Sequence, residues 1–160
     1  MTELRRIFEA AGFAKVETFI ASGNIIFDSR SKNEGALEKK LAGELGRELG
    51  YAVAVFIRSA AKVNEIAEYP AFPKPPPEST LYIAFLSTSV SAERQAKLIS
   101  LESKTDKFRF HERELYWLVL TKLSDSKVSG PVLEKVLGTQ ITVRNSNTVR
   151  KLAAKFEADV

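Results

Sequence analysis

The sequence has no cysteine and a single histidine in 160 residues. Without cysteine there is no disulfide, no thiolate metal ligand and no cysteine nucleophile, a composition typical of reducing compartments. A zinc site would need an unusual set of carboxylates, and no metal-spaced pattern is present, so we expect His111 to be a surface histidine on a strand. We therefore predict a cytoplasmic protein with no metal and no cofactor.

Phosphate-binding loops and membrane segments are also missing. The eight glycines are scattered, and neither GxxxxGK[ST] nor GxGxxG occurs, which argues against ATP or NAD binding by such loops. No apolar run reaches the roughly 18 residues that span a bilayer, and the first residues lack the apolar stretch of a signal peptide. We expect a soluble protein with no membrane partner.

What is present is an ordinary globular composition, with 44% hydrophobic and 28% charged residues. The net charge of +4 would attract an anionic partner. The basic residues are mostly interleaved with acids, as in ESKTDKFRFHERE, which favours a solvated surface of mixed charge. We expect Glu112 and Glu114 in this run to be solvated charges of a hairpin rather than an acid/base pair.

The first half of the chain predicts two helices, a hairpin and a strand. Apolar residues recur with helical spacing over residues 2–11, and Gly12 follows as a stop. Two β-prone runs flank Ser22, Gly23 and Asn24, which predicts a tight hairpin, with one strand kinked at a glycine bulge as the alternative. A second helix follows the capping-box pair Ser31 and Glu34 and ends at Gly50. AVAVFIR at 52–58 then predicts a strand, and AAKVNEIAE a short helix.

A proline-rich segment divides the sequence. Five of the six prolines lie in YPAFPKPPPES, which excludes a helix or a central strand there. We predict an N-terminal half at 1–68, a stiff linker at 69–79 and a C-terminal half at 80–160 that ends in an extra helix. Because Pro73 and Pro76 have the PxxP spacing, a docking ligand is the alternative interpretation of the linker.

The second half predicts alternating strands and helices that read βαββαβ over residues 80–143. The helix signals are clear, with Ser91 and Ser129 as caps, Pro131 in a first turn and Gly138 as a stop. Residues 2–57 read αββαβ. We therefore predict an α+β protein of two tandem ferredoxin-like (βαββαβ) units, the first lacking its opening strand.

The missing strand would belong inside its sheet, so its absence would leave buried backbone groups unpaired. Three repairs are open: a start upstream of Met1, closing up of the remaining strands, or a strand donated by another chain, which would make a homo-oligomer. LYIAFL and LYWLVL are apolar on both faces, unlike an open RNA-stacking sheet. We expect helices on one side of each sheet and the opposite apolar sides to meet each other or a second subunit.

Candidate binding residues gather in TVRNSNTVRKL. An asparagine or serine here caps the last helix, whose first amides carry partial positive charge, and arginine and lysine follow within about a turn. Such a helix start is a generic anion pocket, with an ordinary strand-to-helix junction as the alternative. The Ser22 to Asn24 turn is a weaker candidate. The predicted binding residues are Arg144, Asn145, Asn147, Thr148, Lys151, Ser22, Gly23 and Asn24.

The order of elements, FIASGNIIFDS, the central prolines and TVRNSNTVRKL together resemble an uncharacterised family of small bacterial proteins, domain of unknown function 1697. The resemblance covers nearly the whole chain and implies a tandem ferredoxin-like fold, with no established activity. Relatives usually begin with a strand and an RGINVGG-like segment, which this chain lacks. They commonly have tryptophan where this chain has Ser146, so any contact of that ring is missing here.

These observations favour a non-enzymatic module that binds an anion or a nucleic acid through the arginine-asparagine segment. No GxSxG elbow or other marked nucleophile is present, so we predict no catalytic residue. One alternative is an enzyme acting on a small phosphorylated or carboxylated metabolite, in which Arg144 positions the anion and Asn24 or Asn145 polarises the reacting group. Another is a self-associating scaffold whose partner completes the first sheet.

Overall fold

The computed structural model describes residues 2–19, 23–122 and 126–158. The chain forms two compact units, unit 1 (Met1–Ser59) and unit 2 (Ala60–Val160). The division falls before α3 (Ala60–Glu68), so that helix and the proline-rich segment belong to unit 2, rather than to a first half and a linker. None of the helices in the described residues combines the length and apolarity that crossing a bilayer requires.

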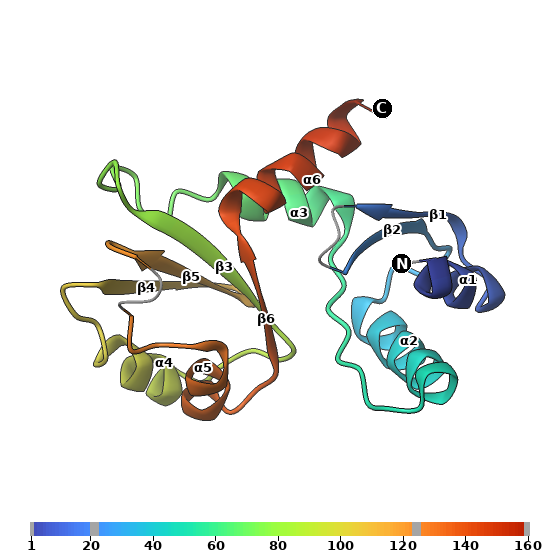
Figure 1. Ribbon diagram of the computed structural model, residues 1–160, viewed down its shortest axis with the longest axis horizontal. Coiled ribbons are helices and arrows are strands. Elements are labelled where there is room, and N and C mark those ends of the chain that lie inside the picture. The colour runs from blue at the N-terminus through green and yellow to red at the C-terminus, as the bar shows by residue number, and fades with distance from the viewer. Residues whose placement is uncertain (1, 20–22, 123–125, 159–160) are drawn as a thin grey trace. The chain divides into compact units, whose positions relative to one another are not determined.

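Unit 1 contains two helices and a hairpin (Figure 1). The elements are α1 (Thr2–Ala10), β1 (Ala14–Phe19), β2 (Asn24–Asp28) and α2 (Glu34–Leu49). β1 and β2 pair antiparallel with Phe19 opposite Asn24, which confirms that these two runs are paired strands rather than one kinked strand. Gly23 has a φ of 83°, a conformation that glycine adopts without the steric cost of a Cβ.

The N-terminus of α2 differs from the prediction. Its cap is Asn33, whose backbone is extended and whose Oδ1 accepts a hydrogen bond from the Ala36 amide at 3.0 Å. Ser31 was predicted to cap this helix, but it lies two residues before the cap, and its Oγ accepts from the amide of Asn33 itself. Asn33 takes the role because its side chain directly precedes the first helical residue. The predicted stop at Gly50 is confirmed, with a φ of 78°.

The core of unit 1 lies between the two helices and one face of the hairpin. Three aromatic rings form its centre, with the Phe27 centroid 5.3 Å from that of Phe8 and 4.8 Å from that of Phe13. These edge-on arrangements are the ones that aromatic quadrupoles favour. The buried residues of the cluster are Ile7, Phe8, Phe13, Val16, Leu37, Leu41 and Leu45.

The predicted strand at 52–58 is wrong. This segment has no strand assignment, and the sheet of unit 1 is two-stranded within the described residues. No strand of the described residues pairs with this segment, and a strand forms only where a neighbour supplies ladder hydrogen bonds. Its apolar side chains still alternate as in a strand, since Val53, Val55 and Ile57 pack against the unit 1 cluster.

Unit 2 is built on a four-stranded antiparallel sheet in the order β4-β5-β3-β6. Its elements follow the order βαββαβ predicted for residues 80–143, and the protein is accordingly of mixed α+β class. They are β3 (Thr80–Leu86), α4 (Ala92–Ile99), β4 (Asp106–His111), β5 (Glu114–Val119), α5 (Gly130–Leu137), β6 (Ile141–Asn145) and α6 (Ser146–Ala158).

The helix signals of unit 2 are confirmed. Ser91 Oγ accepts from the Arg94 amide at the start of α4, and Ser129 Oγ accepts from the Val132 amide at the start of α5. Pro131 lies in the first turn of α5, where its missing N–H costs no helical hydrogen bond. Gly138 ends α5 with a φ of 67°.

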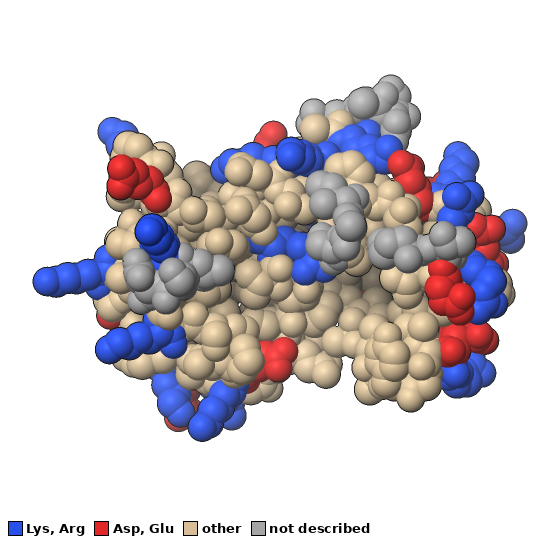
Figure 2. All heavy atoms as spheres, in the orientation of Figure 1, with Lys and Arg blue, Asp and Glu red and all other residues tan. Residues whose placement is uncertain are grey.

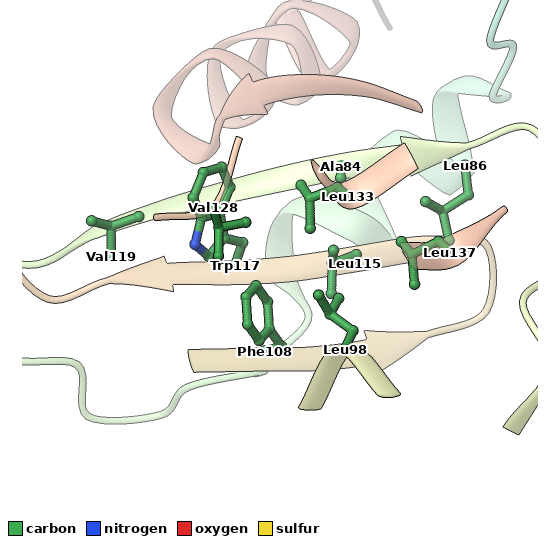
Figure 3. Packing of buried hydrophobic residues seen from close by; sticks show 10 residues of the cluster. All are labelled: Ala84, Leu86, Leu98, Phe108, Leu115, Trp117, Val119, Val128, Leu133 and Leu137. Atoms are coloured by element: carbon green, nitrogen blue, oxygen red, sulfur yellow. The ribbon is translucent and has the colours of Figure 1, made fainter. Parts of the chain in front are cut away.

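Helices cover both faces of this sheet (Figure 1). α4 and α5 cover one face over a core that includes Leu98, Phe108 and Leu133, shown in Figure 3. On the other face, Ile66 of α3 and Val149 of α6 pack against Ile83 and Tyr116. For unit 2, the expectation that the second face meets the other sheet or another subunit is therefore wrong. α3 takes that place because its apolar side packs within unit 2.

Residue Glu114 also departs from the prediction of a solvated hairpin charge, since it is fully buried. It begins β5, a central strand, and lies opposite His111 of β4 and Phe85 of β3. A side chain with paired strands on both sides and helices above is removed from water. Every residue of β5 is buried, as expected for a strand covered on both faces.

Candidate functional site

The predicted binding segment lies where β6 passes directly into α6. Asn145 is the last residue of β6, and its Oδ1 accepts a hydrogen bond from the Asn147 amide at 2.9 Å. Asn145 therefore satisfies one of the free amides at the helix start. Ser146, where relatives were expected to carry tryptophan, is buried with 6% exposure, so a small side chain fits this junction.

Arg144 and Asn145 lie on opposite faces of the sheet. Arg144 is opposite Ile83, which packs under α3 and α6, and Asn145 is opposite Tyr82, which packs against the α4 and α5 core. The structure therefore does not bring these two side chains together, because successive residues of a strand point in opposite directions. Their proximity in the sequence had suggested one shared site, which the strand geometry rules out.

Arg144 is half-buried and already engaged. Its Nη1 donates to Thr142 Oγ1 at 2.8 Å and to the Val143 carbonyl at 3.0 Å. Burial lowers the pKa of the Arg144 guanidinium, since the charged form loses hydration. This residue is placed to order the sheet edge beneath α6, and it is less suited than an exposed cation to meet a ligand.

The exposed cations are Arg150 and Lys151, one turn into α6. Arg150 Nη1 donates to Asn147 Oδ1 at 3.1 Å, which holds the guanidinium beside the helix start. Thr148 is half-buried, and Lys151 is exposed. Figure 2 shows lysine and arginine atoms along the upper edge of the molecule, over α6. The structure thus brings Asn147, Arg150 and Lys151 together on one side of the helix.

A depression of about 430 Å³ lies between α3 and α6. Arg150 lines it from α6, and Asn64 and Glu68 line it from α3. Alanines line the rest of the depression, and their small side chains leave the space open. Its residues are Asn64, Ala67, Glu68, Arg150, Ala153 and Ala154. Sequence reasoning missed it because nothing in the pattern showed that these two helices pack together.

The other predicted site is the hairpin turn of unit 1. Gly23 and Asn24 form its described part, and Ser22 lies outside the described residues. Asn24 is half-buried and starts β2 opposite Phe19. These contacts account for the turn as a structural element, and its role in binding stays a prediction.

A further polar cluster surrounds the β4–β5 hairpin. The His111 ring stacks on that of Tyr69, with centroids 3.9 Å apart and planes 11° from parallel. Lys62 of α3 forms an ion pair with Glu112, and this hydrogen bond lowers the pKa of Glu112 and raises that of Lys62. The predicted surface histidine is thus half-buried and fixes the start of the proline-rich segment to an edge strand.

Tyr116 lies beneath this cluster. Its hydroxyl donates to the Ile66 carbonyl at 2.8 Å, and burial raises the pKa of the phenol well above its usual value. Among the described residues, no three His, Asp or Glu side chains are grouped so that they could hold a metal ion.

Comparison with known proteins assigns the chain to a family. A family model described as "Protein of unknown function (DUF1697)" matches residues 1–116. The chain belongs to this family. The match to DUF1697 ends within β5, so α6 and the residues at its start lie beyond the matched part.

Among solved structures, the fold is similar to that of the conserved bacterial protein SP0830 from Streptococcus pneumoniae, with a TM-score of 0.76 and 24% sequence identity. The alignment covers 98% of this chain and 88% of that protein. At this level of sequence identity, the similarity shows a shared fold and nothing more. No curated protein matches the chain.

Proposed function

We propose that this protein is a non-enzymatic binding module that holds an anionic group of its partner at the start of α6. The supporting observation is a concentration of positive charge. Residues 135–156 contain five basic residues and no aspartate or glutamate, although the rest of the sequence mixes both signs. Two of these cations, Arg150 and Lys151, are exposed next to the helix start.

The helix itself adds to this charge. The free amides at the start of α6 carry about half a positive charge, and this end of a helix attracts phosphates and carboxylates. Arg150 is held beside it by Asn147, so an arriving anion meets an ordered guanidinium. Neither Arg150 nor Lys151 forms an ion pair with a carboxylate of the described residues, so their charge is available to a partner.

Phosphate groups of a nucleic acid are the leading candidates for the anion, and they predict a specific salt dependence. Each phosphate neutralised by a cation contributes about 0.7 to 0.9 to the slope of log affinity against log salt. Two exposed cations therefore predict a shallow slope of about 1.4 to 1.8 for the α6 start alone. Free phosphate or carboxylate ligands would bind more weakly, since they offer fewer contacts.

The test is a fluorescence anisotropy titration of labelled single-stranded RNA and DNA with the full chain at several salt concentrations. Arg150→Gln with Lys151→Gln should weaken binding about tenfold or more and reduce the slope by about 1.4 to 1.8. Lys97→Gln is the matched control, because Lys97 is an exposed cation on α4, which covers the opposite face of the sheet. Equal losses in both variants, or binding that resists high salt, would reject the proposal.

An enzyme acting on a small anionic metabolite is the second candidate, and the depression beside Arg150 favours it. Its volume of about 430 Å³ suits a small ligand, with Arg150 and Glu68 offering charges of opposite sign. Turnover of a phosphorylated metabolite that is abolished by Glu68→Gln would support this function. Thermal stabilisation by ligand without turnover would support the binding module.

We also propose that the two units are related copies of one fold. We regard unit 1 as an incomplete copy of unit 2, since α1, β1, β2 and α2 follow the same order as α4, β4, β5 and α5. The two-stranded sheet and the segment after α2 then occupy the positions of three of the four strands. The predicted cytoplasmic location stays a prediction.

A further inference from the structure

We propose that the depression between α3 and α6 binds the guanine base of a nucleotide whose phosphate is held by Arg150. This inference rests on the proposed function and deepens it, because it adds a base-specific contact beside the cation that holds the phosphate. The two helices lie over one face of the unit 2 sheet (Figure 1), with Ile66 of α3 and Val149 of α6 in one buried cluster. Both helices belong to unit 2, so the depression lies within one compact unit.

Each helix contributes three side chains to the depression. In both helices these positions follow the spacing i, i+3 and i+4, which places side chains on the same side of a helix. The contributors are Asn64, Ala67 and Glu68 from α3, and Arg150, Ala153 and Ala154 from α6. Because the alanines are short, the polar side chains of both helices border the same open space.

The three polar side chains of the depression have groups free to bind a ligand. Neither the Asn64 amide nor the Glu68 carboxylate forms a side-chain hydrogen bond or an ion pair with another described residue. The Arg150 guanidinium donates from Nη1 to Asn147 Oδ1, and it does not pair with Glu68. A ligand between the two helices can therefore meet a cation, an amide and a carboxylate at once.

The size of the depression favours a nucleotide over a simple anion. Its volume is about 430 Å³, within the range of about 300 to 1,000 Å³ that is usual for small-molecule sites. A phosphate held by Arg150 would occupy only a small part of this space. The remainder admits a sugar and a base, whose flat apolar face would lie against the alanine methyl groups.

Glu68 determines which base fits. An ionised carboxylate only accepts hydrogen bonds, through two oxygens that lie side by side. Guanine has two adjacent N–H donors on its Watson–Crick edge, at N1 and N2, and they match these oxygens. Adenine and cytosine have a ring-nitrogen acceptor beside the amino group, and uracil has one N–H between two carbonyl oxygens, so each sets an acceptor against the carboxylate. The Asn64 amide nitrogen then donates to guanine O6.

The test is a fluorescence anisotropy titration of the full chain with a short labelled uridine RNA, in which one central uridine is replaced by guanosine, inosine or adenosine. Guanosine should tighten binding about tenfold over the all-uridine RNA, because two hydrogen bonds to a charged acceptor form. Inosine lacks the 2-amino group and should bind about threefold or more weakly than guanosine, since it loses one of these bonds. Adenosine should give no gain.

Two variants of α3 separate the base contact from general charge. Glu68→Gln should abolish the preference for guanosine, because the new amide presents N–H groups where the carboxylate accepts. It should leave the all-uridine RNA bound equally or slightly more tightly, since a negative charge is removed. Glu65→Gln is the matched control, because Glu65 is an exposed carboxylate of the same helix that does not line the depression, and it should keep the preference.

The outcomes distinguish this inference from the proposed function. Equal affinity for all the RNAs, or a preference for guanosine that survives Glu68→Gln, would overturn the inference and leave the anion site at the α6 start standing. Loss of the preference in both glutamate variants would overturn it as well, since the effect would then come from charge alone. If none of the RNAs binds, the inference and the nucleic-acid form of the proposed function both fall.

Discussion

The guanidinium of Arg94 lies directly over the backbone of Gly138. Arg94 Nη1 donates to the Val136 carbonyl at 3.1 Å, and a Cβ added at Gly138 would lie 2.7 Å from the Arg94 Cζ. The contact joins the start of α4 to the end of α5. Gly138 is thus required both by its positive φ and by the side chain that covers it.

Gly138→Ala should lower the free energy of unfolding by about 1 to 2 kcal/mol, because an L-residue at positive φ is strained and Arg94 must move. Urea denaturation measures the loss. Gly130→Ala is the control, since no atom lies within 4 Å of a Cβ there and its φ is not positive, so it should be neutral or slightly stabilising. When Gly138→Ala is combined with Arg94→Ala, its cost in stability should fall, because the clash with the Arg94 side chain is gone. The strain of the positive φ should remain. Equal effects of the two glycine substitutions would contradict this explanation.

Asp106 predicts a second stability effect. It is 2% exposed, and its Oδ1 accepts hydrogen bonds from Trp117 Nε1 and from Ser126 Oγ, both at 2.7 Å. Its Oδ2 accepts a third hydrogen bond, from Thr105 Oγ1 at 2.7 Å. Asp106→Asn should cost about 1 to 3 kcal/mol, because the amide nitrogen that replaces one carboxylate oxygen cannot accept a hydrogen bond. Trp117 is the only tryptophan, so its fluorescence reports the change directly. Unchanged denaturation and an unchanged emission spectrum would show that the network contributes nothing.

The ion pair of Lys62 and Glu112 predicts a pH dependence. The folded pKa of Glu112 is lowered from 4.5, so its contribution is present above that value and is lost as the pH falls through the folded pKa. The folded pKa of Lys62 is raised from 10.5, so its contribution is present below that value and is lost as the pH rises through the folded pKa. Glu112→Gln should reduce the acid dependence of the melting temperature between about pH 3 and 5, whereas Glu78→Gln, an exposed carboxylate in a loop, should not.

The two units predict separable effects of core truncation. Leu41 in unit 1 and Leu133 in unit 2 are both 0% exposed, and each change to alanine should cost about 2 to 5 kcal/mol. Hydrogen exchange should show Leu41→Ala loosening α1 and α2, with the β3 and β5 amides still protected. Leu133→Ala should show the reverse. Uniform loss across the chain in both variants would mean that the units unfold as one.

Local signals in the sequence were sufficient for most elements. The caps at Ser91 and Ser129, the glycine stops at Gly50 and Gly138, and the pairing around Asn24 follow from interactions within a few residues. Long-range relations were less accessible. The burial of Glu114, the packing of α3 on α6 and the opposite directions of Arg144 and Asn145 depend on which strands and helices are neighbours. The candidate site consequently moved from Arg144 toward Asn147, Arg150 and Lys151.

The sequence alone determined the α+β class, the order of elements in residues 80–143 and the positive stretch before the C-terminus, because periodicity, capping and charge are written in neighbouring residues. Only the tertiary structure decided that 52–58 is not a strand and that α3 covers the second face of the unit 2 sheet. A strand exists only where a partner offers hydrogen bonds, and a helix packs where an apolar face is free, so both outcomes depend on segments distant in the chain.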